Sequence, residues 1–159
     1  MHEKTRIALK KILKKILDYK KIDLPDFLKQ VGYNSYYYDY RIDENNVRVH
    51  ELYEILVKAG TTIHLKIIDK NNKVIEEVSG TNIDEMATEI GKIVRELVLK
   101  KYGRFSNLYR RNKLKQSSGV INQHFNIRSK CSLDYVFLYS ELSGYKIKTR
   151  AELTTNNLK

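Results

Sequence analysis

Basic side chains gather in two blocks of the 159-residue chain. Residues 1–21 hold eight basic and two acidic residues, and residues 100–115 hold seven basic residues and no acid. Residues 22–99 carry a net charge of −5 and residues 116–159 a net charge of +3, within a total of +11. Because lysine and arginine bind phosphates, the two blocks suggest two contact zones for a polyanion. Solvated helix faces are the alternative explanation.

Side chains suited to catalysis or metal binding are scattered. The histidines lack the paired spacing of metal ligands, and the single cysteine has no evident base partner: His2, His50, His64, His124 and Cys131. The sequence contains no phosphate-binding glycine loop. The acid pairs at 76–77 and 84–85 fall at a predicted strand and a helix start, where capping explains them better than acid–base chemistry. We therefore expect no enzymatic activity, no metal and no cofactor.

The composition is that of a soluble globular protein, with 42% apolar and 31% charged residues. No apolar run approaches the ~18 residues of a membrane span, so we expect no membrane partner. Residues 1–11 do not read as a secretory signal. One cysteine excludes an internal disulfide and favours the reducing cytosol.

The first half of the chain has helical periodicity. Residues 3–19 predict an amphipathic helix with two apolar i+4 rows, Ala8–Ile12–Ile16 and Leu9–Leu13–Leu17. Asp23 is placed to cap a helix that reaches about Gln30, and Asn34 or Ser35 to cap one that reaches about Ile42. A fourth helix is expected over residues 49–59 with one apolar face: Val49, Leu52, Ile55, Leu56 and Ala59.

Strand patterns follow, and then more helices. Residues 61–69 and 74–78 alternate around a polar turn and predict a hairpin. Helices are expected over residues 83–101, 106–116, 117–127 and 133–143, and a strand over 145–150. The order helix, two short helices, helix, glycine, strand thus occurs twice, with Gly60 and Gly144 lying 84 residues apart. This agreement predicts an internal repeat; a single all-α bundle with coincidental spacing is the alternative.

Residues 23–32, DLPDFLKQVG, resemble the helix-turn-helix signature of the lambda-repressor-like (XRE-type) family. Asn34 stands at the cap of that family's recognition helix, with Tyr38 and Ile42 at its inward positions. The stretch NNVRVHEL at 45–52 is similar to the family's lead into its fourth helix, and the resemblance covers residues 3–69. Leu28 departs from it, standing where the family usually has alanine, which would widen the angle between the two helices.

The resemblance implies duplex DNA binding by the second helix of the pair, whose first residues reach base edges. In the first copy the implied contacts are Asn34, Ser35, Tyr36, Tyr37, Tyr40 and Arg41, with Asn45, Asn46 and Arg48 on the adjacent backbone. Among the clustered tyrosines, Tyr38 is the predicted core residue. The acidic residues Asp39, Asp43 and Glu44 weigh against DNA binding by this copy, because DNA is also negatively charged.

The second copy is more basic and matches the family less well. Its candidate pair spans residues 106–116 and 117–127, with Ile121 and Phe125 inward. Polar side chains suited to base edges are Ser117 as cap, Ser118, Asn122, Gln123 and Asn126. Basic side chains suited to phosphates are Arg110, Arg111, Lys113, Lys115, Arg128 and Lys130. An ordinary polar helix face is the alternative.

We expect a mostly α protein with a small β-hairpin and tandem, pseudo-symmetric helix-turn-helix bundles. The expected parts are one unit at 3–60, a hairpin connector at 61–80 and a divergent second unit at 83–150. The expected function is sequence-specific binding of double-stranded DNA by a repressor-like transcriptional regulator, in a bacterial or phage-type, nucleoid-associated cytoplasmic setting. A homodimer is a further possibility. The alternatives are an adaptor or inhibitor that binds a protein through the tyrosine cluster, and a non-specific architectural DNA binder.

Overall fold

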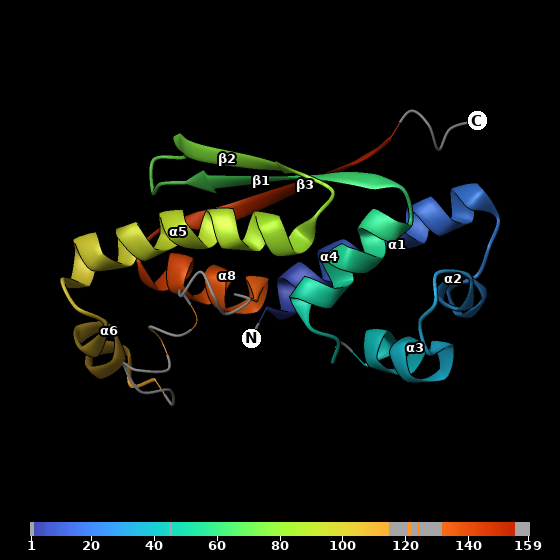
Figure 1. Cartoon of the computed structure of the whole chain (residues 1–159), viewed down its shortest axis with the longest axis horizontal. Helices are drawn as coiled ribbons and strands as arrows, with labels where there is room; N and C mark the ends of the chain where they lie inside the picture. The colour runs from blue at the N-terminus through green and yellow to red at the C-terminus, as the bar shows by residue number, and fades with distance from the viewer. Residues whose placement is uncertain (1, 45, 115–120, 122–123, 125–131, 155–159) are drawn as a thin grey trace. The chain divides into compact units, whose positions relative to one another are not determined.

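The computed structural model describes residues 2–44, 46–114, 121, 124 and 132–154. These residues are mostly helical and form one three-stranded sheet in the order β2–β1–β3 (Figure 1). It divides into two compact units, Met1–Ile63 with Ala151–Lys159, and His64–Arg150. Strand β1 (Thr61–Ile68) leads from the first unit into the second, and β3 (Lys146–Leu153) leads back. The mostly α expectation is confirmed, and the predicted hairpin is part of a larger sheet because β3 pairs with β1.

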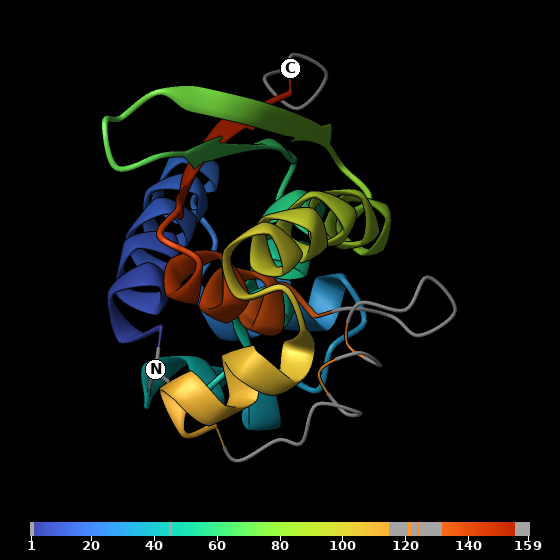
Figure 2. The same ribbon diagram turned by 90° about the vertical axis from the view of Figure 1, so that its left-hand side faces the viewer.

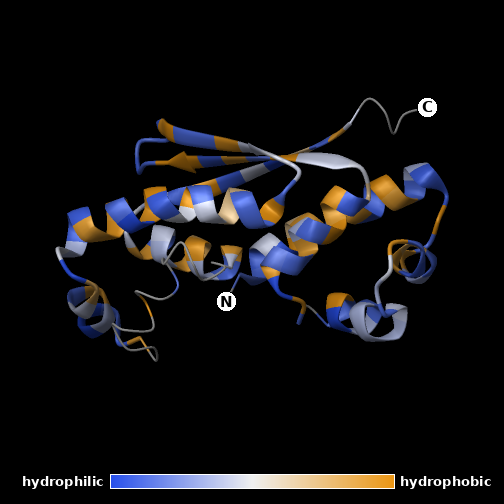
Figure 3. Cartoon of the chain, in the orientation of Figure 1, coloured by the Kyte–Doolittle hydropathy of each residue, from blue (hydrophilic) through white to orange (hydrophobic). Residues whose placement is uncertain are grey.

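Four helices build the first unit: α1 (Glu3–Lys20), α2 (Leu24–Gln30), α3 (Ser35–Asp43) and α4 (Val49–Lys58). Helix α1 packs against α4 and α2, and α2 packs against α3. The predicted apolar face of α4 is fully buried. In α1 the leucine row is fully buried, whereas burial in the second predicted row increases along the helix, from the exposed Ala8 through the half-buried Ile12 to the buried Ile16. The stripes on α1 are visible in Figure 3.

The second unit holds β2 (Val74–Gly80), α5 (Ile83–Tyr102), α6 (Phe105–Asn112) and α8 (Leu133–Leu142). Helix α5 packs against α8, α6 and β2. Figures 1 and 2 show α5 and α8 on one side of the sheet. Ile63, Leu65 and Ile67 of β1 are fully buried, and the residues between them are half-buried, as the alternation of side chains along a strand requires.

Helix α6 is shorter than the helix predicted over 106–116. It ends at Asn112 because Lys113 has a left-handed φ of 49° and the Leu114 backbone N–H donates to the Tyr109 carbonyl. The Asn112 side chain reinforces this end by donating to the Leu108 carbonyl at 2.9 Å. Of the helix predicted over 117–127, the described residues are Ile121 and His124, both helical, and Ile121 is fully buried as predicted.

The ends of α4 and α8 repeat the same local structure. Both helices have ten residues and lie 84 positions apart (49 to 133, 58 to 142). Gly60 and Gly144 have φ values of 98° and 89°, and their N–H groups donate to Val57 and Glu141 at 2.9 and 3.0 Å. A strand follows each glycine. The predicted similarity of the two halves therefore extends to backbone geometry at these ends. None of the described helices is long and apolar enough to cross a membrane.

Candidate nucleic-acid interface

Helices α2 and α3 are joined by a turn of four residues, 31–34. Asp23 caps α2 by accepting from the Asp26 N–H at 2.9 Å, and Asn34 caps α3 by accepting from the Tyr37 N–H at 3.2 Å. Gly32 takes a φ of 88° within the turn. Both predicted caps are confirmed, so α3 begins where the resemblance places a recognition helix.

Replacing Gly32 with alanine should lower the free energy of unfolding by about 1 kcal/mol. An added Cβ would meet nothing within 4 Å, so the cost comes from the positive φ alone. Urea unfolding of Gly32→Ala measures it. Gly80→Ala is the matched control, since its Cβ would make ordinary contact with Met86 at 3.6 Å. Equal stability of Gly32→Ala and the parent chain would contradict the prediction.

Three tyrosines of α3 face solvent and define what we call the tyrosine face: Tyr36, Tyr37 and Tyr40, which are 89%, 49% and 62% exposed. The prediction that Tyr38 is a core residue is wrong, because its side chain is only half-buried. Its ring packs edge-on against those of Tyr33 and Tyr37. The pKa of the Tyr38 hydroxyl is raised, mainly by burial and to a smaller extent by the nearby Glu51 carboxylate. Ile42 fills the other predicted inward position and is buried.

Arg41 is engaged inside the unit. Its guanidinium donates to the Tyr37 hydroxyl at 2.7 Å and to the Asn46 carbonyl at 3.0 Å, and Nη1 lies 3.9 Å from Glu51 Oε2. That carboxylate oxygen is buried and accepts no hydrogen bond from any residue that the structure describes. Arg41 therefore holds α3, the following loop and α4 together, and is poorly placed for the DNA contact predicted for it.

The remaining predicted contacts of the first unit lie around α3. Asn34, Asn46 and Arg48 are exposed and Ser35 is half-buried. The loop before α4 is tied to α1, since Arg6 Nε donates to the Val47 carbonyl at 2.7 Å. In the second unit, Arg110, Arg111 and Lys113 are exposed at the end of α6. The other predicted contacts fall outside the described residues: Asn45, Lys115, Ser117, Ser118, Asn122, Gln123, Asn126, Arg128 and Lys130.

An apolar groove of about 490 Å³ runs beside α1 and α3. Its floor includes Leu13, Leu17 and Ile42. Asp39 and Asp43 of α3 border this groove and also a second one beside Tyr36 and Tyr40. The acidic side chains of α3 thus lie at its middle and at its end, whereas its first turn carries no acid.

Two features of the second unit escaped sequence reasoning. His124 Nδ1 lies 2.6 Å from the Tyr139 hydroxyl, and the His124 ring stacks on Tyr135 with centroids 3.7 Å apart. Lys146, Lys148 and Arg150 are exposed along β3. The alternation KIKTR at 146–150 was a signal for the second feature; no pattern around His124 pointed to its partners, which are 11 and 15 residues away.

The unfolding free energy should fall as the pH drops below about 6.5, the ordinary pKa of histidine. Burial lowers the pKa of His124 in the folded chain. The unfolded state therefore binds the proton first, and stability is lost as the pH moves from 6.5 towards the folded-state pKa. Urea midpoints measured between about pH 7.5 and pH 5.5 test this. His124→Gln should flatten the dependence, and an unchanged slope would contradict it.

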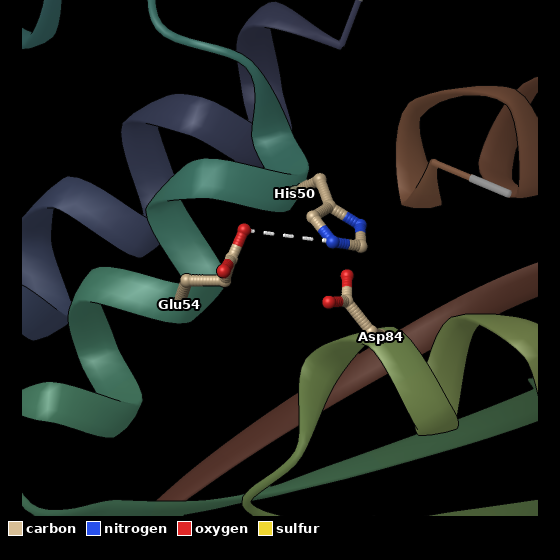
Figure 4. Close-up of side chains that lie close together, drawn as sticks. All are labelled: His50, Glu54 and Asp84. Carbon is tan, nitrogen blue, oxygen red and sulfur yellow. Dashed lines mark ion pairs between the residues drawn. The ribbon is translucent and has the colours of Figure 1, made fainter. Parts of the chain in front are cut away.

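On α4, His50 and Glu54 lie one turn apart and form an ion pair of 3.5 Å when the imidazole is protonated (Figure 4). Two ligands from one helix are fewer than a protein metal site needs, so this pair by itself does not make one. Asp84, the third residue drawn, belongs to the second unit.

The first unit thus presents two capped helices, a glycine-containing turn and a tyrosine face on the second helix. Comparisons with protein-family models, with curated proteins and with solved structures gave no match for this chain.

Proposed function

We propose that the chain binds duplex DNA sequence-specifically through helix-turn-helix units and acts as a repressor-like transcriptional regulator. The observation that carries this proposal is the α2–turn–α3 segment. Both helices are capped, and the first turn of α3 exposes Tyr36 and Tyr37 and carries no acidic residue. In such motifs the first residues of the second helix reach base edges, so Asn34, Tyr36 and Tyr37 are proposed readers. The exposed Tyr40, one helical turn after Tyr36, is a fourth. Of the two acids of α3, Asp43 would lie beyond these positions and Asp39 among them.

The charge for phosphate contacts comes from outside α3. Helix α1 carries exposed lysines, including Lys4, Lys11, Lys14 and Lys15, and α6 ends in Arg110 and Arg111. The repeated α4 and α8 ends support a second unit in the same chain. With two unlike units, one chain would read an asymmetric site.

Selection from a random duplex pool tests this function. The purified chain is mixed with the pool at low and at near-physiological salt, and the bound fraction is sequenced. We expect an enriched motif that survives the higher salt. An asymmetric motif supports two units of one chain acting together, and a palindromic motif supports a homodimer. Binding that collapses with salt and enriches nothing contradicts sequence-specific reading.

A second candidate is a protein-binding adaptor that uses the tyrosine face. Asp39 and Asp43 border this face, and tyrosine is enriched at protein interfaces. This function predicts a basic protein partner whose capture depends on Tyr36 and Asp39, with no enriched DNA motif.

A further inference from the structure

The edge strand β3 carries a row of basic side chains on one face. Lys146, Lys148 and Arg150 are exposed, while Ile147 and Thr149 between them are half-buried. Alternate residues of a strand point to the same side of the sheet, so the three cations share one side. In the order β2–β1–β3 this strand has a neighbour on one side only.

The central strand adds a fourth cation to this side. Lys66 alternates with Leu65 and Ile67, which are buried, and α5 and α8 cover one side of the sheet (Figure 2). Buried side chains of a strand face the covered side. Lys66 therefore lies on the open side of the sheet, with the basic row of β3. We call these four residues the basic sheet face: Lys66, Lys146, Lys148 and Arg150. Two acids share the open side: Glu77 of the neighbouring strand β2, which alternates with the buried Val78, and Glu152, which follows Arg150 in the exposed row of β3. The part of the basic sheet face farthest from both along β3 is Lys146 and Lys148.

We propose that the basic sheet face binds the sugar–phosphate backbone of nucleic acid, as a contact that needs no base reading. The unit His64–Arg150 contains 17 basic and nine acidic residues, a net charge of +8 (17 minus 9), so the surrounding charge attracts a polyanion. Alternate residues of a strand are spaced by about 6.6 Å, so successive cations of β3 are far enough apart for each to contact a separate phosphate. Among the described residues, the side-chain ammonium groups of Lys146 and Lys148 have no ion-pair or hydrogen-bond partner.

Edge-strand lysines also have a purely structural use, since they discourage strand pairing between molecules. That role predicts aggregation when the lysines are replaced, without any change in nucleic-acid binding. The two roles therefore separate in one set of variants.

The test uses the full chain and a labelled duplex of random sequence, with affinity measured over a range of salt concentrations. Lys146→Gln/Lys148→Gln removes two charges from the basic sheet face. Lys70→Gln/Lys92→Gln removes two exposed charges of the same unit, from the hairpin turn and from α5, and is the matched control. We expect the slope of log affinity against log salt to fall by nearly 2 in the first variant, about 0.9 for each lost phosphate contact, and to stay unchanged in the control.

Equal slopes in the two variants would overturn the basic sheet face, as would aggregation of Lys146→Gln/Lys148→Gln with an unchanged slope for its soluble fraction. Either of these results leaves the proposal of sequence-specific binding by α3 intact if selection from the random duplex pool still yields an enriched motif. Conversely, a reduced slope without any enriched motif supports the sheet face and contradicts the proposed regulator. A parent chain that binds no duplex even at low salt overturns both.

Discussion

Replacing Tyr36 and Tyr40 together with alanine should weaken binding to the selected duplex by about 100-fold or more. Both side chains are largely exposed on α3, and losing the recognition of one base pair typically costs about 1–3 kcal/mol. Tyr37 is left in place because its hydroxyl accepts a hydrogen bond from Arg41, so that its loss would also disturb the loop before α4. Titration of the selected duplex and of a scrambled duplex measures the effect.

The matched control is Tyr19→Ala, which removes a 61% exposed tyrosine from α1. It should leave both affinities unchanged, and thermal unfolding should show that neither variant alters stability by more than about 0.5 kcal/mol. If Tyr36→Ala/Tyr40→Ala retains its affinity for the selected duplex but no longer captures a protein partner, the adaptor function replaces the regulator.

Leu28→Ala should lower the unfolding free energy by about 2–5 kcal/mol. Leu28 is fully buried in α2, and its carbonyl accepts from the Tyr33 N–H at 2.9 Å in the turn that leads to α3. Alanine is the residue that the resemblance places here, but this core is packed around leucine, so the substitution leaves a cavity. Because the chain has no tryptophan, urea unfolding is followed by circular dichroism and tyrosine fluorescence.

Two neighbouring changes frame this result. Leu28→Met, which nearly conserves volume, should cost less than about 1.5 kcal/mol. Lys29→Ala, at the exposed next position, should stay within about 0.5 kcal/mol. A Leu28→Ala chain as stable as the Lys29→Ala chain would mean that α2 and α3 close over the cavity without cost.

Local signals predicted most of the secondary structure. The caps at Asp23 and Asn34, the buried face of α4 and the glycine ends at Gly60 and Gly144 all depend on residues a few positions apart. The predicted end of α6 was wrong: the helix ends at Asn112 because Lys113 adopts a left-handed φ. Glycine is the usual sequence signal for such a residue, and lysine gives none. The half-burial of Tyr38 likewise depends on its packing against Tyr33 and Tyr37.

By itself, the sequence determined the order of the helices and strands, because apolar periodicity and capping act within one or two turns of chain. It also determined where the charge lies along the chain, but not which charges remain available to a ligand. Only the tertiary structure decided that the Arg41 guanidinium interacts with Tyr37, Asn46 and Glu51. It also decided that β3 pairs with β1, which brings Lys146 and Lys148 onto the same side of the sheet as Lys66. Strand pairing joins residues about 80 positions apart, and periodicity within each strand carries no information about its partner.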